Sequence, residues 1–225
     1  WSDIGCPWAT LALHTLHTAA RERGRRLLVD HRAFPLELVP RQPTPKPIVD
    51  AETVVIAARR PELGWRLWSG PESQYPVTTL PALEAVQAAK DPAVGGLPAS
   101  DELDTALRRA FYADNRCISV HAVILDVASQ CEHVRVAALA EALARGSGRA
   151  EVYAQWRQAR GSHVQGSPHL FAPGGWEAHN PGAVFHWTGD PNRGGLPFLE
   201  SYSTSWAEEL LDRTALRATA PESLP

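Results

Sequence analysis

Hydrophobic and polar positions predict three different elements in the first part of the chain. Residues 7–23 place apolar side chains along one side of a helix, and Gly24 follows as a stop signal. Residues 27–34 begin with a short apolar run that ends before Pro35, which predicts a buried strand. Four prolines within residues 39–48 then predict an extended crossing loop, because proline disrupts regular structure.

The middle of the chain is predicted to be helical. Apolar residues recur there at three-to-four spacing, which is the period of an amphipathic helix. The helices that we expect are residues 80–90, 101–113, 119–129, 135–145 and 149–160. Asp101 and Ser119 are plausible N-caps because their short polar side chains accept hydrogen bonds from free backbone N–H groups.

After Gly161 the pattern changes to short strand-like runs separated by turn residues. The elements expected there are strands at residues 169–172 and 183–187, a surface loop at residues 188–197 and a last helix at residues 203–216. The pattern therefore predicts a discontinuous α/β domain formed by residues 1–48 and 161–225. A helical insertion domain, residues 49–160, interrupts it.

Composition narrows the functional classes. The 225 residues are 44% hydrophobic, which is enough to bury a core, and the formal net charge is −3 with no basic block. These values argue against nucleic acid or an anionic membrane surface as the main partner, and no apolar run approaches the roughly 20 residues of a membrane helix. Three cysteines, an odd number, argue against a fully paired secreted framework and favour a reducing compartment such as the cytoplasm. Methionine is absent, so we treat Trp1 as a cut point.

One cysteine stands where a helix is predicted to begin. Cys6 directly precedes Pro7, and proline is favoured at the first helical position. A thiolate there faces free backbone N–H groups and the positive end of the helix dipole, so we expect a lowered pKa and raised reactivity. A buried, inert thiol is the alternative. Trp8 is expected to be partly exposed beside the thiol, as a wall for an apolar or aromatic ligand.

These residues carry a resemblance. Trp1-Ser2-Asp3 leading into Cys6-Pro7-Trp8 resembles the active-site segment of the DsbA-like branch of the thioredoxin-fold superfamily, and the segments Gln42-Pro43-Thr44-Pro45 and Gly166-Ser167-Pro168-His169 fall where that branch has them. The branch includes 2-hydroxychromene-2-carboxylate isomerases and kappa-class glutathione transferases. The resemblance implies an α/β, thioredoxin-like fold with a large all-helical insertion. It also implies an opening strand before Trp1, so we expect residues upstream.

The resemblance assigns roles to the late segment. Pro168 matches the cis-proline that such folds place against the catalytic cysteine, and X-Pro is the bond that tolerates cis. Ser167 would then offer its backbone to an extended ligand; an ordinary turn is the alternative. His169 is a further candidate because it follows Pro168. Asp3 would raise the pKa of Cys6 if it is close, and a cap or turn carboxylate is the other interpretation.

One departure from the family pattern matters for mechanism. A dithiol oxidoreductase needs a second cysteine three residues after the first, because that thiol releases the mixed disulfide. Ala9 occupies this position. Cys6 is therefore expected to act as a single thiol, with glutathione or another external thiol. Cys117 and Cys131 are more simply explained as structural thiols, and sequence does not place them within bridging distance.

Three functions remain open from the sequence. The first is a DsbA-like thiol-disulfide oxidoreductase that uses Cys6 and holds its substrate with Ser167, Pro168 and Trp8. The second is a glutathione-dependent isomerase or transferase of the 2-hydroxychromene-2-carboxylate isomerase type. The third is a non-catalytic thioredoxin-fold binding protein.

Few cofactors or partners are expected. His14 and His17 lie on one helix face, but two imidazoles without a third ligand make a weak zinc site. We expect no metal and no bound cofactor, with glutathione as a co-substrate at most. The partner is expected to be a thiol or disulfide substrate or another small molecule, and a homodimer stays open.

Overall fold

The chain starts with an extended segment that leads directly into its first helix. The computed structural model describes residues 1–218. Helix α1 (Pro7–Glu22) has Cys6 at its N-cap position, in extended conformation, and Pro7 in its first turn, as predicted. Arg23 closes the helix, and Gly24 follows with φ of 60°. The first predicted helix is confirmed.

Helix α2 (Lys46–Arg59) begins inside the segment that was expected to be a loop. Pro45 occupies its N-cap position, and Pro47 lies in the first turn. A missing N–H has no consequence there, because the first N–H groups of a helix have no intrahelical partner. The prediction of a loop over residues 39–48 is therefore wrong for its last three residues.

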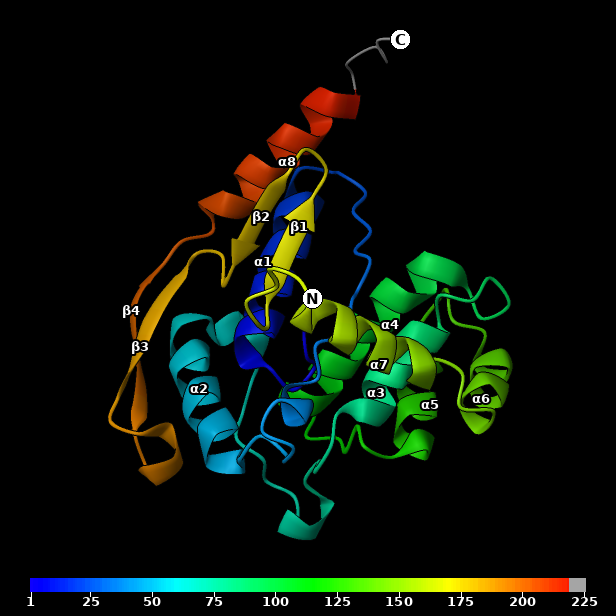
Figure 1. Cartoon of the computed structure of the whole chain (residues 1–225), viewed down its shortest axis with the longest axis horizontal. Coiled ribbons are helices and arrows are strands. Elements are labelled where there is room, and N and C mark those ends of the chain that lie inside the picture. Colours follow the sequence, from blue (N-terminus) through cyan, green and yellow to red (C-terminus); the bar gives the residue numbers. More distant parts are fainter. Residues whose placement is uncertain (219–225) are drawn as a thin grey trace.

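The predicted helices of the middle region are all present. They are α3 (Leu80–Ala88), α4 (Gly96–Tyr112), α5 (His121–Ala128), α6 (Val136–Ala144) and α7 (Arg149–Arg160). Figure 1 shows this group gathered on one side of the molecule. Asp101 and Ser119 are not N-caps, because α4 already starts at Gly96 and Val120 holds the N-cap position of α5. None of the described helices is long and apolar enough to cross a membrane.

Two antiparallel hairpins follow the helical group. They are formed by β1 (His169–Ala172) with β2 (Trp176–His179), and by β3 (Ala183–Thr188) with β4 (Leu196–Tyr202). Within residues 1–218 they form two separate two-stranded sheets, and α8 (Ser205–Ala218) follows them. Strands β1 and β3 agree with the prediction. Strands β2 and β4 were not predicted, and the predicted loop over residues 188–197 is wrong for its last two residues, which begin β4.

The strand predicted over residues 27–34 is not formed. Only Ala33 makes a bridge, which is parallel to Ser2: Ser2 N donates to Arg32 O over 2.9 Å and Phe34 N to Ser2 O over 3.0 Å. A strand needs a hydrogen-bonded neighbour along its length, and the described residues supply one only at Ser2. The apolar first half of the segment instead borders a cavity of about 450 Å³.

The hydrophobic core has two parts that meet at α1. One face of α1 packs against Trp206, Leu210 and Leu211 of α8. The main core contains the helical group together with Cys6, Trp8 and the strand residue Leu199. The thiol therefore lies at the edge of the main core, and its surroundings come from both ends of the chain.

Candidate active site

The structure brings Cys6 and the predicted proline loop together. Cys6 Sγ donates a hydrogen bond to Ser167 O over 3.2 Å, and the Ser167–Pro168 peptide bond is cis. Ser167 also contacts the segment before the thiol, because its Oγ accepts a hydrogen bond from Asp3 N over 2.9 Å. Cys6, Asp3, Ser167 and Pro168 thus form one site, although they lie at opposite ends of the sequence.

The thiol of Cys6 is not activated in this arrangement. Cys6 is only 4% exposed. Burial raises the pKa of Cys6 to about 12, and the nearby negative charge of Glu52 adds to this, while the hydrogen bond to Ser167 opposes it. The expectation of a lowered pKa is wrong for this structure, because removal of water from a thiolate outweighs the favourable position at the helix N-terminus.

Trp8 is covered rather than exposed. Its ring is 4% exposed and stacks on Phe185 of β3, with centroids 4.0 Å apart and an interplanar angle of 12°. Its Nε1 donates a hydrogen bond to Glu52 Oε1 over 2.9 Å. The expectation of a partly exposed wall is therefore wrong, because Phe185 of β3 packs over the Trp8 ring.

Glu52 is a carboxyl group near the thiol that sequence reasoning missed. It projects from α2, is half-buried, and has its pKa raised to about 7 by burial, although the hydrogen bond from Trp8 opposes this. Its charge is second only to burial in raising the pKa of Cys6. Nothing in the local sequence of α2 distinguishes Glu52 from an ordinary surface glutamate.

Asp3 has the role of a turn carboxylate, which was one of its two interpretations. Its Oδ1 accepts a hydrogen bond from Gly5 N over 2.8 Å, and its Oδ2 accepts one from Leu36 N over 2.7 Å. Burial raises the pKa of Asp3 even though these bonds favour the charged form. Asp3 also raises the pKa of Cys6, as expected, but it is a minor cause.

His169 begins β1, as predicted, and is buried. Its Nδ1 accepts a hydrogen bond from Gln165 N over 3.1 Å, and its ring lies 4.4 Å from that of Phe171. Its backbone exchanges two 2.9 Å hydrogen bonds with Trp1. These contacts indicate a structural role that joins β1 to the segment before Cys6.

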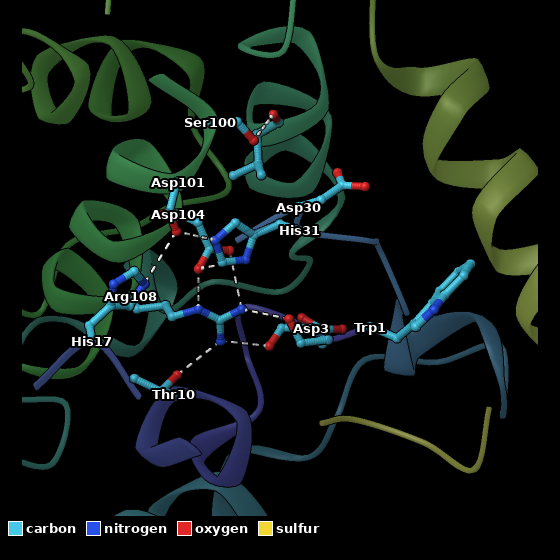
Figure 2. Close-up of polar contacts among 12 residues, drawn as sticks. Trp1, Asp3, Thr10, His17, Asp30, His31, Ser100, Asp101, Asp104 and Arg108 are labelled. Atoms are coloured by element: carbon cyan, nitrogen blue, oxygen red, sulfur yellow. Dashed lines mark hydrogen bonds and ion pairs between the residues drawn. The ribbon is translucent and has the colours of Figure 1, made fainter. Parts of the chain in front are cut away.

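A buried guanidinium fixes the segment on the other side of the thiol. Arg108 of α4 is 2% exposed. It donates to Asp104 over 2.6 and 3.2 Å, to Asp3 O over 2.9 Å, to Thr10 Oγ1 over 3.0 Å and to Ser2 Oγ over 2.9 Å. Figure 2 shows these bonds converging on one side chain. Arg108 thereby ties α4 to the residues that flank Cys6.

The same network extends to two carboxylates and two imidazoles (Figure 2). His31 Nε2 lies 2.8 Å from Asp101 Oδ1, and His31 Nδ1 lies 3.4 Å from Asp104 Oδ2. His17 Nε2 lies 3.2 Å from Asp101 Oδ1. Arg108 thus offsets the charge of Asp104, and ring nitrogens of the two imidazoles lie against Asp101 and Asp104, which supplies polar partners to carboxylates that are costly to bury alone.

The sequence did contain a signal for this network. Asp104 and Arg108 are spaced i, i+4 on α4, where side chains meet. They lie within the apolar spacing set by Leu103, Leu107 and Phe111, all of which are buried. A charged pair inside an apolar stripe predicts a buried ion pair, because isolated charges are rarely buried.

The remaining cysteines and histidines do not enlarge the site. Cys6, Cys117 and Cys131 are all free. Cys131 is buried, and its Sγ donates to Val127 O over 3.7 Å. His14 Nε2 lies 3.4 Å from Thr18 Oγ1. Within residues 1–218, no group of three or more His, Cys, Asp or Glu side chains is arranged to hold a metal ion.

Comparisons with known proteins identify the fold. No family model and no curated protein matches the chain. Among solved structures, it is similar to the "crystal structure of a putative protein disulfide isomerase from Nitrosomonas europaea", with a TM-score of 0.60 and 14% identity, over 97% of this chain and 96% of that chain. A similarity at this identity establishes the fold alone. The protein has an α/β, thioredoxin-like fold with a large all-helical insertion.

Proposed function

We propose that the protein is a thiol-disulfide oxidoreductase that works through one cysteine, Cys6. The observation that carries the proposal is the 3.2 Å contact between Cys6 Sγ and Ser167 O, next to Pro168 and at the N-terminus of α1. A thiol at a helix N-terminus is favoured as a thiolate once water reaches it. The thioredoxin-like fold supports the proposal as an analogy of fold.

The proposed reaction has two exchange steps. Cys6 Sγ loses its proton, and the thiolate attacks one sulfur of a substrate disulfide. A bond forms between Cys6 and that sulfur, the original S–S bond breaks, and the departing thiolate takes up a proton. Glutathione then attacks the sulfur attached to Cys6, which restores the thiol and releases the other half of the substrate as a glutathione disulfide. This external thiol is needed because Ala9 replaces the second cysteine.

Two other functions each have one supporting observation. Ala9 favours a glutathione-dependent isomerase or transferase, because such an enzyme needs no second cysteine. The buried thiol of Cys6, with its pKa of about 12, favours a non-catalytic binding protein in which this cysteine is inert. We rank both below the exchange reaction, because the Cys6 thiol lies beside the Ser167 backbone, where a substrate disulfide in an extended chain can pair with that backbone.

Mass spectrometry after incubation with glutathione disulfide tests the proposal. We expect one glutathione adduct on Cys6 that reduced glutathione removes, and glutathione-dependent reduction of hydroxyethyl disulfide. Cys6→Ser should lose both, whereas the matched cysteine variants Cys117→Ser and Cys131→Ala should keep both. If Cys6 forms no adduct at any pH at which the protein stays folded, the exchange reaction is wrong and the two other functions remain.

Calorimetry with reduced glutathione separates the remaining alternative. An isomerase or transferase must bind glutathione as a resident co-substrate, so it should give saturable binding without any adduct. The exchange reaction requires only transient contact. Saturable binding together with the absence of disulfide reduction would favour the isomerase or transferase.

A further inference from the structure

The β3–β4 hairpin covers Trp8, which lies two residues after Cys6 in the candidate active site. Cys6 and Trp8 are each only 4% exposed, although both begin a helix at the edge of the core. The cover over Trp8 is the ring of Phe185, at a centroid distance of 4.0 Å. Figure 1 shows the hairpin standing beside α2 and apart from the hairpin formed by β1 and β2.

Within residues 1–218, only side chains attach this hairpin to the helices beneath it. Strands β3 and β4 are paired only with each other among the described residues. The backbone bonds that leave the hairpin are local to its base, from Ala183 N to Asn180 O and from Ser203 N to Gly182 O. The hairpin can therefore move away from α1 without breaking a sheet.

The attachments along the hairpin differ in strength. Phe185 pairs in register with Leu199, which is buried in the main core. Farther along β4, the hydroxyl of Tyr202 contacts Thr15, and Arg60 stacks over the Tyr202 ring at 5.7 Å. Displacement of Phe185 alone would open a narrow gap above Trp8, whereas full removal of the hairpin must also expose Leu199 and break the contacts of Tyr202.

We infer that the β3–β4 hairpin limits Cys6 to small thiols and disulfides and that Phe185 is the residue that sets this size limit. The inference rests on the proposed thiol chemistry of Cys6. A small disulfide reaches the thiol through the gap opened by Phe185. A folded protein or a long polymer needs the whole hairpin to leave, which costs more free energy because more buried contacts are lost.

The inference is tested with two reagents that share one reactive group. They are the pyridyl disulfides of aminoethanethiol and of a long polyethylene glycol thiol, both applied to protein with Cys117→Ser and Cys131→Ala so that only Cys6 reports. Each rate is divided by the rate for the same protein unfolded in denaturant, which removes the intrinsic difference between the reagents. In the otherwise native chain we expect protection against the polymer to exceed protection against the small reagent by at least about tenfold.

Phe185→Ala should reduce this discrimination. Loss of the stack should raise the rate with the polymer roughly tenfold, because it removes an aromatic pair that holds the hairpin down. Phe185→Leu, which keeps an apolar side chain, should give an intermediate rate. Val184→Ala is the matched control: Val184 is the neighbouring residue on the exposed face of β3 and should change neither rate.

Each outcome has a separate meaning. If the chain without a hairpin substitution protects Cys6 equally against both reagents, there is no size limit. That result would leave the proposed exchange reaction intact. If Phe185→Ala raises no rate in a protein that circular dichroism shows to be folded, Phe185 does not set the limit. If Cys6 reacts with neither reagent in any folded variant but reacts when unfolded, the proposed function itself is wrong.

Discussion

The motif of residues 6–9 is held in different ways on its two sides. On one side, Arg108 connects α4 to Ser2, Asp3 and Thr10 through hydrogen bonds that are all buried. On the other side, the ring of Phe185 from the β3–β4 hairpin stacks on Trp8. The first side determines where the thiol lies, and the second determines what can reach it.

The contrast has a physical basis. A buried polar network is strong only when every member has a partner, so partial opening on the Arg108 side would leave charges without water or counter-charge. An aromatic stack is less directional and loses only part of its contact when it shifts. We therefore expect the Arg108 side to open only when the whole protein unfolds and the hairpin side to open locally.

Arg108→Ala should give the largest loss of stability. It leaves the carboxylate of Asp104 buried without its main partner, so we expect the free energy of unfolding to fall by about 3 to 5 kcal/mol. Urea denaturation monitored by tryptophan fluorescence measures this. Arg109→Ala is the matched control, because Arg109 is next to Arg108 on α4 but is exposed and lies 3.7 Å from Asp114; its effect should stay within about 0.5 kcal/mol. Similar losses in both variants would show that the buried network does not hold this side.

Glu52→Gln should stabilise the protein in a pH-dependent way. Burial raises the pKa of Glu52 from 4.5 to about 7, so between these values the unfolded chain ionises while the folded protein keeps its proton. The free energy of unfolding of the native protein therefore falls as pH rises through this window, and the loss persists at higher pH. Glutamine keeps an oxygen for Trp8 but carries no charge. We expect the variant to gain about 2 to 3 kcal/mol relative to the native protein between pH 4 and pH 8, measured by urea denaturation at each pH.

The same substitution links this carboxyl to the thiol. The charge of Glu52 raises the pKa of Cys6, second only to burial, so its removal should lower that pKa. The rate of Cys6 alkylation by iodoacetamide should then increase at pH 8 and show a lower midpoint in a pH series. A stability difference between Glu52→Gln and the native protein that does not change with pH would show that Glu52 is solvated. An unchanged alkylation midpoint would show that Glu52 is remote from the thiol.

Asp101→Asn tests the outer part of the Arg108 network. Burial acts to raise the pKa of Asp101, but hydrogen bonds and charge from His17 and His31 outweigh it and hold that pKa well below its usual range. This contribution to stability is present above the usual carboxyl pKa of about 4 and is lost as pH falls. We expect the variant to lose about 1 to 2 kcal/mol at pH 6 and less at pH 3.5.

Asp126→Asn is the control for that measurement, because its exposed side chain pairs with Arg116 on the surface. Its stability should change by less than about 0.5 kcal/mol at both pH values. A loss for Asp101→Asn that does not shrink on acidification would contradict a charged Asp101 in the folded protein.

The sequence predicted the elements whose pattern is local. Helix α7 and strand β1 have the predicted boundaries, because apolar spacing, Gly161 and the turn residues mark them. Residues 27–34 have an equally clear strand pattern, but a strand also depends on a neighbour. Strand β4 was missed because Gly194 and Gly195 directly before it and Pro197 at its second position are typical of a loop.

The candidate site was predictable only in part, for a related reason. The pairing of Cys6 with Ser167 followed from resemblance to a known family rather than from spacing. The burial of Trp8 and the raised pKa of Cys6 depend on Phe185 and Glu52, which belong to other elements. A residue pattern can indicate that a thiol begins a helix, but solvent access is decided by whatever packs over it.

Tyr202→Phe should give the smallest loss of stability, and this loss should affect only the β3–β4 hairpin. The hydroxyl of Tyr202 contacts Thr15 and lies 3.4 Å from Arg60 Nη1. Removal of this hydroxyl leaves neither partner without a polar contact, because Thr15 also donates to Leu11 O and Arg60 also pairs with Glu62. The loss should therefore be about 1 kcal/mol or less, which corresponds to a roughly fivefold increase in local opening. Hydrogen exchange should become faster for amides of β3 and β4 while those of α4 stay unchanged. Equal acceleration in α4 would show that the hairpin and the Arg108 side open together, and the distinction between a fixed side and a movable side would then fail.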